Sequence, residues 1–349
     1  MPTESGKIGF GIIGCGEISN HYVPAAQQQE DGDAVWCMDI NEYNARRIGE
    51  AFNCPYTTDL DVVLNDKRVD VVVVAVPHAI HKEITIKAAR AGKHVMCDKP
   101  IATTREDALE MIKVCKECNV KLGTNLASRF QPFSEVAKKI IDDGIIGEVM
   151  AVKISAYANK PASYWTTGWM ENNDTSWRAS KKMAGGGIGI MNMTHEIDRM
   201  SYVTGLKIDH VSGEYDTFVA DVEVEDTFAG VWRYNNGAIG ICLASSNMLG
   251  NSHEPNRIFG TKGQLQLWEP VKVFTTREDT QYTPNEWHEI PAERIKIDYI
   301  PLMKAWIKAI REDTDPPITG EDGFRVLDAV LGVYDSSDTN KVIFMKKDI

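Results

Sequence analysis

A run of valines, Val69-Asp70-Val71-Val72-Val73-Val74-Ala75-Val76, is apolar on both faces of an extended chain. Such a strand is typical of the interior of a parallel sheet that helices cover on both sides. Strand-like and helical patterns alternate around it, which indicates parallel βαβ winding. We expect strands at residues 8–13, 34–38, 71–76, 94–97 and 121–124, and helices at 19–30, 42–52, 59–65, 81–91 and 105–118. Residues 1–125 are therefore predicted to form a doubly wound α/β Rossmann domain.

The second half of the chain has a different pattern: after about Gly147, long segments alternate between apolar and polar residues, as strands do. Expected strands cover residues 149–156, 208–218, 226–234, 238–244, 257–260, 264–268 and 272–275. Asn236-Gly237 predicts a hairpin between two of them, because both residues tolerate positive φ angles. Helices at 299–311 and 323–337 are expected to pack back on the first domain. Residues 126–349 are predicted to form an α+β domain around a large open, mostly antiparallel sheet, for substrate binding and oligomerisation.

Composition limits the partners of this 349-residue chain, which is too long for one ordinary core. A net charge of −12 without a basic block argues against nucleic acid or an anionic membrane as a partner. No apolar run approaches the roughly 20 residues that span a bilayer, and residues 1–7 lack the features of a leader. Seven scattered cysteines suit a reduced, cytoplasmic protein. Cys115 and Cys118 have no second ligand pair, so no metal site is predicted.

The first expected strand ends in Gly14-Cys15-Gly16-Glu17-Ile18-Ser19, directly before a helical pattern. In a dinucleotide-binding turn, the first glycine permits the tight bend and the second lets a pyrophosphate approach the positive end of the helix. Ser19 replaces the third glycine, which mainly allows close packing of the helix. Asp39 follows the second strand, where a carboxylate grips the adenosine ribose and repels a 2′-phosphate. We predict NAD as the cofactor, while Arg46 and Arg47 leave NADP possible.

Polar residues follow two further strands of the expected parallel sheet. Pro77, His78 and His81 come after the third strand, and Asp98-Lys99 comes after the fourth. Ligands of doubly wound sheets lie beyond the carboxyl ends of the strands. A lone lysine is usually a solvated surface charge, but at this position Lys99 is well placed to reach a substrate hydroxyl.

A second polar group follows Trp177-Arg178 and the triple glycine at residues 185–187. If residues 191–198 are helical, Asn192, His195 and Asp198 share one face. Three polar side chains on one face, after glycines that allow close approach, indicate a site rather than a solvated stripe. The aromatic stretch at residues 164–170 either covers a sugar-like substrate or serves packing or an oligomer contact.

Together these motifs resemble the Gfo/Idh/MocA family, named for glucose-fructose oxidoreductase, inositol dehydrogenase and rhizopine catabolism, over nearly the whole chain. The resemblance rests on Gly14-Cys15-Gly16, Asp98-Lys99-Pro100 in place of the usual Glu-Lys-Pro, Arg129-Phe130, Trp177-Arg178, the triple glycine followed by His195-x-x-Asp198, and Gly320-Glu321-Asp322-Gly323. It implies a two-domain enzyme that oxidises a ring hydroxyl of a sugar, glycoside or cyclitol with NAD(P), or runs the reverse reduction.

The resemblance also implies roles for single residues. Lys99 contacts the reacting hydroxyl, His195 takes part in proton transfer, and Trp177 and Arg178 lie near the nicotinamide. Many members have an Asp four residues before the histidine, where this chain has Met191. The expected catalytic residues are Lys99, Asn192 and His195; the substrate residues are Lys99, Arg129, Asn192 and His195; the cofactor residues are Gly14, Gly16, Glu17, Ile18, Asp39, Pro77, His78, His81, Asp98, Lys99, Trp177 and Arg178.

The chemistry of a dehydrogenase needs a proton acceptor. His195, with an ordinary pKa of about 6.5, accepts a proton near neutrality, while Lys99 either shares that task or stabilises the alkoxide. Two other functions stay open at this point: a glycosidase that uses bound NAD transiently, and a non-catalytic sugar-sensing regulator. The uncovered face of the second sheet predicts a homodimer or homotetramer.

Overall fold

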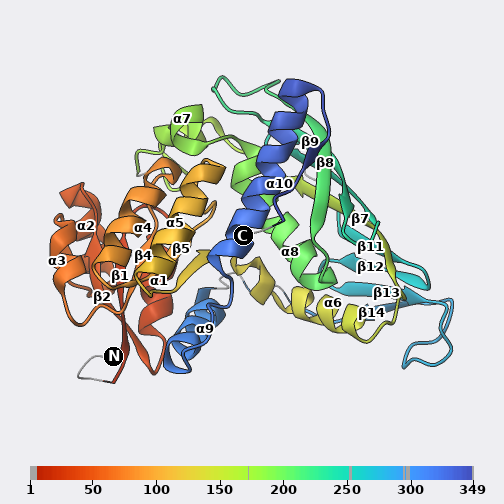
Figure 1. Ribbon diagram of the computed structural model, residues 1–349, viewed down its shortest axis with the longest axis horizontal. Helices are drawn as coiled ribbons and strands as arrows, with labels where there is room; N and C mark the ends of the chain where they lie inside the picture. The colour runs from red at the N-terminus through yellow and green to blue at the C-terminus, as the bar shows by residue number, and fades with distance from the viewer. Residues whose placement is uncertain (1–5, 172, 251–253, 294, 296–298, 348–349) are drawn as a thin grey trace.

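The computed structural model describes residues 6–171, 173–250, 254–293, 295 and 299–347. Residues 1–5, on which the expectation about a leader rests, lie outside this set. The described residues form two sheets with helices around and between them (Figure 1). The first sheet is parallel, with the strand order β3-β2-β1-β4-β5-β6. Its strands are β1 Ile8–Ile13, β2 Gly32–Met38, β3 Tyr56–Thr57, β4 Val71–Val74, β5 His94–Asp98 and β6 Leu122–Asn125.

The valine run forms the centre of this sheet, as predicted. All four valines of β4 are fully buried, because helices cover both faces. These helices are α1 Ser19–Gln27, α2 Glu42–Phe52, α3 Leu60–Asn65, α4 His81–Arg90 and α5 Arg105–Glu117. Strand order reverses between β1 and β4, so the carboxyl ends of these two strands mark the crevice in which such sheets bind ligands.

The second sheet has nine strands in the order β14-β13-β12-β11-β7-β10-β9-β8-β15. Its neighbours are antiparallel except β7 and β10, which run parallel. Gly237, with φ of 86°, makes the predicted hairpin between β9 and β10. The strands are β7 Val149–Tyr157, β8 Ile208–Asp216, β9 Thr227–Tyr234, β10 Ile239–Ser245, β11 Asn256–Gly260, β12 Gly263–Leu267, β13 Val271–Thr275, β14 Trp287–Ile290 and β15 Ile343–Phe344.

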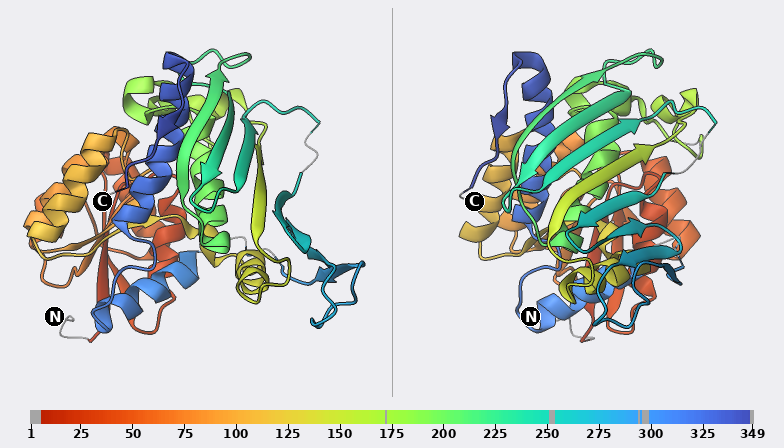
Figure 2. Two further views of the ribbon diagram at one scale, coloured as in Figure 1. Left: turned by 45° about the vertical axis from the view of Figure 1, so that its right-hand side comes forward. Right: turned by 90° about the vertical axis from the view of Figure 1, so that its right-hand side faces the viewer.

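Helices cover one face of the second sheet, and the other face points outward (Figure 2). Along β10, Ile239, Ile241 and Leu243 are exposed while the residues between them are buried. The covering helices include α6 Pro132–Asp142, which the sequence patterns did not reveal, and α8 Thr194–Thr204. A five-residue π-turn, Gly189–Met193, leads directly into α8.

Two helices near the C-terminus join the halves, as predicted. Helix α9 Tyr299–Arg311 packs on α1, and α10 Gly320–Thr339 packs on α5 and β6 on one side and on β8 on the other. A capping box between Thr319 and Asp322 starts α10 three residues before the expected position.

Three further features concern the compartment and possible metals. No helix in the described part of the chain combines the length and apolar character needed to cross a membrane. The seven cysteines are all free thiols. Within the described residues, His, Cys, Asp and Glu side chains do not gather into a group that could hold a metal ion.

Candidate active site

The turn after β1 has the shape that a dinucleotide requires. Gly14 has φ of 100°, and a Cβ there would lie 2.2 Å from the carbonyl oxygen of Ala75, so only glycine fits. A Cβ on Gly16 would meet no described atom within 4 Å, which leaves space beside this backbone for a ligand. Ser19 is buried and its Oγ donates to the carbonyl oxygen of Gly16 at 2.6 Å. No side chain caps α1 in the described structure, so the positive end of the helix is available to a phosphate.

Asp39 lies beside this turn, at the end of β2. Its Oδ2 accepts from the backbone N–H of Cys15 at 2.8 Å, and its Oδ1 accepts from that of Asn41 at 2.8 Å. Arg47, one of the two arginines that left NADP possible, donates instead to the carbonyl oxygen of Cys15 at 2.9 Å and to Asn173 Oδ1 at 3.3 Å. The structure thus places a carboxylate where the adenosine ribose is expected.

The two histidines after β4 are buried in the protein. His78 Nδ1 lies 2.8 Å from the carbonyl oxygen of Ala184, and its ring meets that of Trp177 edge-on at 4.6 Å. The ring nitrogens of His81 lie 2.8 Å and 2.9 Å from the carbonyl oxygens of Pro100 and Val76. Because both nitrogens are engaged within the protein and the residue is fully buried, neither nitrogen is free to bind the cofactor as expected. His81 instead connects the loops that follow β4 and β5.

Asp98 also differs from the expectation that it binds the cofactor. Its Oδ1 accepts from the backbone N–H of Lys99 at 2.9 Å and from Asn125 Nδ2 at 3.3 Å, and Tyr22 forms a further hydrogen bond with it. Burial raises the pKa of this carboxyl, while the charges of Lys99 and His81 lower it. Asp98 is therefore committed to holding the backbone that carries Lys99.

Lys99, at the end of β5, reaches the segment that carries His195 and acts electrostatically on that histidine. Lys99 Nζ donates to the carbonyl oxygen of Met191 at 2.5 Å, four residues before the histidine. Burial lowers the pKa of His195 well below 6.5, and the charge of Lys99 lowers it further. Burial also lowers the pKa of Lys99. His195 Nδ1 is buried without a hydrogen-bond partner among the described atoms, so Nε2 is the ring nitrogen that a ligand can reach.

Asn192 contacts Lys160, a residue that the sequence patterns did not indicate. Its Oδ1 accepts a hydrogen bond from Lys160 Nζ at 2.8 Å. Lys160 lies in the loop after β7, is only 6% exposed, and has its nitrogen 4.3 Å from the centre of the Tyr164 ring. Burial lowers the pKa of Lys160 to about 7, and the charges of Lys99 and Arg178 contribute. The sequence signal was a Lys-Pro pair shortly before the aromatic stretch, and such a pair looks like an ordinary loop.

Arg129 does not join this cluster, contrary to its expected role in substrate binding. Its Nε and Nη2 donate to the carboxylate of Asp198 at 2.8 and 2.6 Å, and its Nη1 lies 3.2 Å from Asp322. Both acids and Arg129 line a separate cavity of about 400 Å³, whose lining does not include Lys99, Asn192 or His195. The guanidinium is therefore occupied in linking α8 to α10. The expected common face of Asn192, His195 and Asp198 is divided, since Asp198 pairs with Arg129 while Asn192 contacts Lys160.

The triple glycine lets other parts of the protein, rather than a ligand, pack closely against its backbone. A Cβ on Gly186 would lie 2.4 Å from the Tyr334 hydroxyl, and one on Gly187 would lie 1.8 Å from the carbonyl oxygen of Glu225. The Glu225 carboxylate accepts from the N–H groups of Gly187 and Gly189 and from the Tyr334 hydroxyl. This buried acid, which was not predicted, links the π-turn to Tyr334 of α10.

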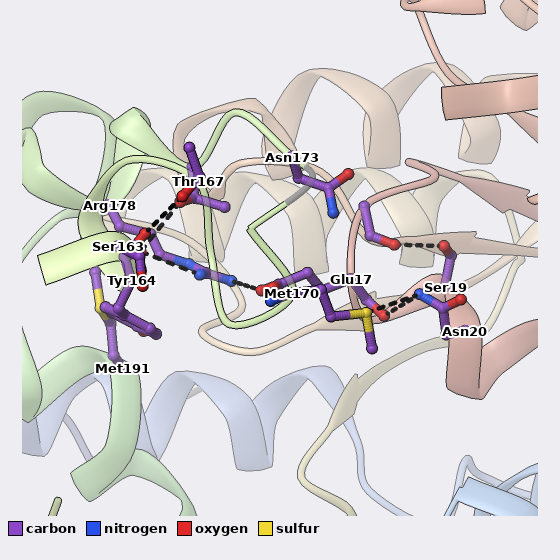
Figure 3. Close-up of polar contacts among 12 residues, drawn as sticks. Glu17, Ser19, Asn20, Ser163, Tyr164, Thr167, Met170, Asn173, Arg178 and Met191 are labelled. Atoms are coloured by element: carbon purple, nitrogen blue, oxygen red, sulfur yellow. Dashed lines mark hydrogen bonds and ion pairs between the residues drawn. The ribbon is translucent and has the colours of Figure 1, made fainter. Parts of the chain in front are cut away.

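The segment formed by residues 163–171 and 173–178 lies against the dinucleotide turn (Figure 3). Glu17 Oε2 accepts from Arg178 Nη2 at 3.0 Å, and Glu17 Oε1 accepts from the backbone N–H of Met170 at 2.8 Å. The Arg178 guanidinium also lies 4.5 Å from the centre of the Tyr164 ring. Tyr164 is buried whereas Trp169 is exposed. Part of the aromatic stretch therefore serves packing, and Glu17 ties the segment to the first domain.

Comparisons with known proteins agree with this architecture. The model of an oxidoreductase family with an NAD-binding Rossmann fold matches residues 8–126, and that of the GFO/IDH/MocA C-terminal domain matches residues 135–266. The chain is 27% identical over 344 residues to 1,5-anhydro-D-fructose reductase of Ensifer adhaerens, which covers 95% of this chain and 97% of the relative. It is 26% identical over 325 residues to myo-inositol 2-dehydrogenase of Thermotoga maritima, with coverage of 90% and 91%.

The fold also has close counterparts among solved structures. Levoglucosan dehydrogenase in complex with NADH and levoglucosan superposes with a TM-score of 0.86 at 24% identity, over 98% of this chain and 100% of that one. The predicted architecture of a Rossmann domain followed by an α+β domain is thereby confirmed.

Proposed function

This chain belongs to the Gfo/Idh/MocA family of oxidoreductases, and we propose that it oxidises a ring hydroxyl of a sugar, glycoside or cyclitol with NAD, or catalyses the reverse reduction. The observation that carries this proposal is that Lys99, at the end of β5, donates to Met191, four residues before His195, and that its charge acts on His195. Residues 1–125 hold the cofactor, and residues 126–349 supply most of the substrate site.

The residues around the turn fit a dinucleotide. The open backbone at Gly16 and the uncapped start of α1 would receive the pyrophosphate. Asp39 would accept from the hydroxyls of the adenosine ribose, and Trp177 and Arg178 would lie at the nicotinamide end. When bound, NAD supplies the acceptor for the hydride that leaves the substrate carbon.

The two central residues divide the remaining work. His195 is neutral at pH 7 because burial and the charge of Lys99 lower its pKa, so its imidazole can accept the hydroxyl proton. Lys99 donates a hydrogen bond to the reacting oxygen and stabilises the negative charge that develops there. The carbonyl oxygen of Met191 holds the Lys99 ammonium in place, and Asn192 borders the same site.

Variants of Lys99 and His195 test this assignment. We expect Lys99→Met and His195→Asn each to lower kcat by about 10²- to 10⁴-fold, the usual contribution of a positioned acid or base. The assay follows NADH absorbance with a panel of sugars, glycosides and inositols, with NAD and with NADP. Burial and the charge of Lys99 lower the pKa of His195, so the imidazole stays neutral down to that pKa. On the acidic side, kcat/KM in the wild type should therefore begin to fall only below pH 6.5.

His288, on the edge strand β14, provides the control, and His288→Asn should leave the rates unchanged. Undiminished rates in both active-site variants would refute the assignment. Release of free sugar without net NADH would indicate a glycosidase instead, and a lack of turnover across the panel would indicate a sensor.

We also propose that a second copy of the chain covers the outward face of the nine-stranded sheet. Ile239, Ile241 and Leu243 form an exposed apolar row along β10, and Val231 lies opposite Ile241 on β9. Contiguous apolar surface of this kind is typical of interfaces. The arrangement suits a homodimer or, with further contacts, a homotetramer. We place the protein in the cytoplasm because its seven cysteines are free thiols, and its charge of −12 makes nucleic acid an unsuitable partner.

A further inference from the structure

Lys160 is a buried lysine of the site that has no acidic hydrogen-bond partner among the described residues. Its nitrogen donates to Asn192 Oδ1 at 2.8 Å and faces the rings of Tyr164, at 4.3 Å, and Trp165, at 5.5 Å. Amide oxygens and aromatic faces both favour the charged form of the amine. In the described part of the chain, Lys160 forms no ion pair. A buried charge of this kind is costly unless something pairs with it.

The acids of the site are already committed to other groups. Glu225 attracts the ammonium, but its carboxylate accepts from two backbone N–H groups and from the Tyr334 hydroxyl. Glu17 accepts from Arg178 and from the backbone of Met170. Asp98 accepts from the backbone beneath Lys99. Among the described residues, no carboxylate of the site is left to neutralise Lys160.

The other charges that face Lys160 are positive. Lys99 and Arg178 both repel it, and with burial they lower its pKa to about 7. The nearest residues of the π-turn add no negative charge, since Met191 and Asn192 are neutral. The oxidised nicotinamide would add a further positive charge. The site as a whole therefore favours a ligand that brings an anion with it.

On the basis of the hydride transfer proposed above, we propose that the substrate is an acidic ring sugar, such as a uronate, whose carboxylate pairs with Lys160. Lys160 donates to Asn192 and Lys99 donates to Met191, so the two amines contact neighbouring residues of one turn. A single sugar ring can then place its carboxylate at Lys160 and a reacting hydroxyl at Lys99 and His195. The rings of Tyr164 and Trp165 exclude water from the ion pair and strengthen it.

Matched pairs of sugars test the inference. Glucose and glucuronate, galactose and galacturonate, and mannose and mannuronate each differ only by an alcohol or a carboxylate at one carbon. For at least one pair, we expect wild-type kcat/KM to favour the uronate by about 100-fold, the effect of a desolvated charge pair. Lys160→Met should lower kcat/KM for the uronate far more than kcat/KM for the neutral sugar, so that the preference disappears. Calorimetric titration of Lys160→Met with the preferred uronate should show a corresponding loss of affinity relative to the wild type.

Two controls separate charge from structure. Lys160→Arg keeps the charge and should retain most of the preference. Lys67, exposed in the loop before β4, is far from the site in the fold, and Lys67→Met should behave as the wild type. The pH profile gives an independent readout: kcat/KM for the uronate should fall as Lys160 loses its proton at alkaline pH, whereas kcat/KM for the neutral sugar should not.

Three results would overturn the inference. One is a wild-type enzyme that prefers the neutral member of every pair; another is equal turnover of both members. The third is a Lys160→Met variant that loses both activities equally, which would mark Lys160 as a proton acceptor or a structural residue. In each case NADH is still formed by the wild type, so the proposed dehydrogenase function would stand. If NADH forms with none of these sugars or the wider panel, the dehydrogenase proposal itself fails.

Discussion

Asp39 shows how a single carboxylate can set cofactor choice. Its two oxygens accept from the backbone of Cys15 and Asn41, which holds the carboxylate beside the dinucleotide turn. It forms no ion pair with a described residue, because Arg47 donates to Cys15 and Asn173 instead. A 2′-phosphate would therefore meet an uncompensated negative charge.

Asp39→Asn should shift cofactor preference toward NADP. The variant keeps an oxygen for the Cys15 N–H group and removes the charge, whose repulsion at a few ångströms near a protein surface amounts to about 1–4 kcal/mol. We expect the ratio of kcat/KM with NADP to that with NAD to rise by about 10- to 100-fold. Steady-state kinetics with both cofactors measures it, and Asp61→Asn in the exposed start of α3 is the control. An unchanged ratio would remove Asp39 from the ribose site.

At the scale of elements, the segment of residues 163–171 and 173–178 is held to the dinucleotide turn mainly through one side chain. Glu17 accepts from Arg178 and from the backbone of Met170, and a Cβ on Gly168 would lie 2.4 Å from its Oε1. Both members of the ion pair are largely shielded from water, at 12% and 16% exposure. The position of Arg178 and of the Tyr164 ring therefore depends on the N-terminal domain.

Glu17→Ala should loosen this segment and weaken cofactor binding. Hydrogen bonds to charged groups contribute about 1.5–3 kcal/mol each, so we expect KM for NAD to rise by about tenfold or more. Hydrogen exchange at residues 163–171 and 173–178 should accelerate in the same variant. Glu83→Ala, which removes an exposed pair with Lys87 on α4, should change neither quantity. Unaltered exchange in Glu17→Ala would show that packing alone holds the segment.

At the scale of the whole molecule, the second sheet has one covered and one uncovered face. Helices α6, α8 and α10 pack on the inner face, while Ile239, Ile241 and Leu243 point outward from β10. Pairing two such faces would remove this apolar surface from water, which is the main driving force of association. The assembly proposed for this protein thus follows from which face the helices leave free.

Ile241→Glu should convert the assembly to monomers. Burying an unpaired carboxylate in an apolar interface costs several kcal/mol, so we expect the dissociation constant to rise by about 100-fold or more. Light scattering of wild type and variant measures the mass. Ile40→Glu is the matched control, since Ile40 is 89% exposed in the first half of the chain. A wild type that is monomeric at micromolar concentration would contradict the proposal.

Most of the fold could be predicted because its elements are long and periodic. The five helices and five of the six strands of the first sheet were expected within three residues of their ends. Helix α6, which follows a 3-10 turn at Ala127–Phe130, was missed although its eleven residues form an amphipathic pattern. The missed strands are short: β3 and β15 have two residues each, and β14 has four. Periodicity needs several residues before it can be recognised.

The site was predictable only in part. Lys99, Asn192 and His195 were expected together, and the structure brings them around Met191 and Lys160. Arg129 was expected at the substrate but pairs with Asp198 and Asp322, and Lys160 was not expected at all. A charged residue in a loop has the same sequence signature whether it is solvated, paired or enclosed.

The sequence by itself determined the order and type of the elements and the shape of the dinucleotide turn, because these depend on residues a few positions apart. The φ of Gly14 and the alternation along β10 are local properties of this kind. The tertiary structure alone decided which charges are paired and which are buried. The lowered pKa of Lys160 arises from burial and from Lys99 and Arg178, which approach it from other elements. Electrostatic interactions act through space, so only the folded arrangement of these groups can set them.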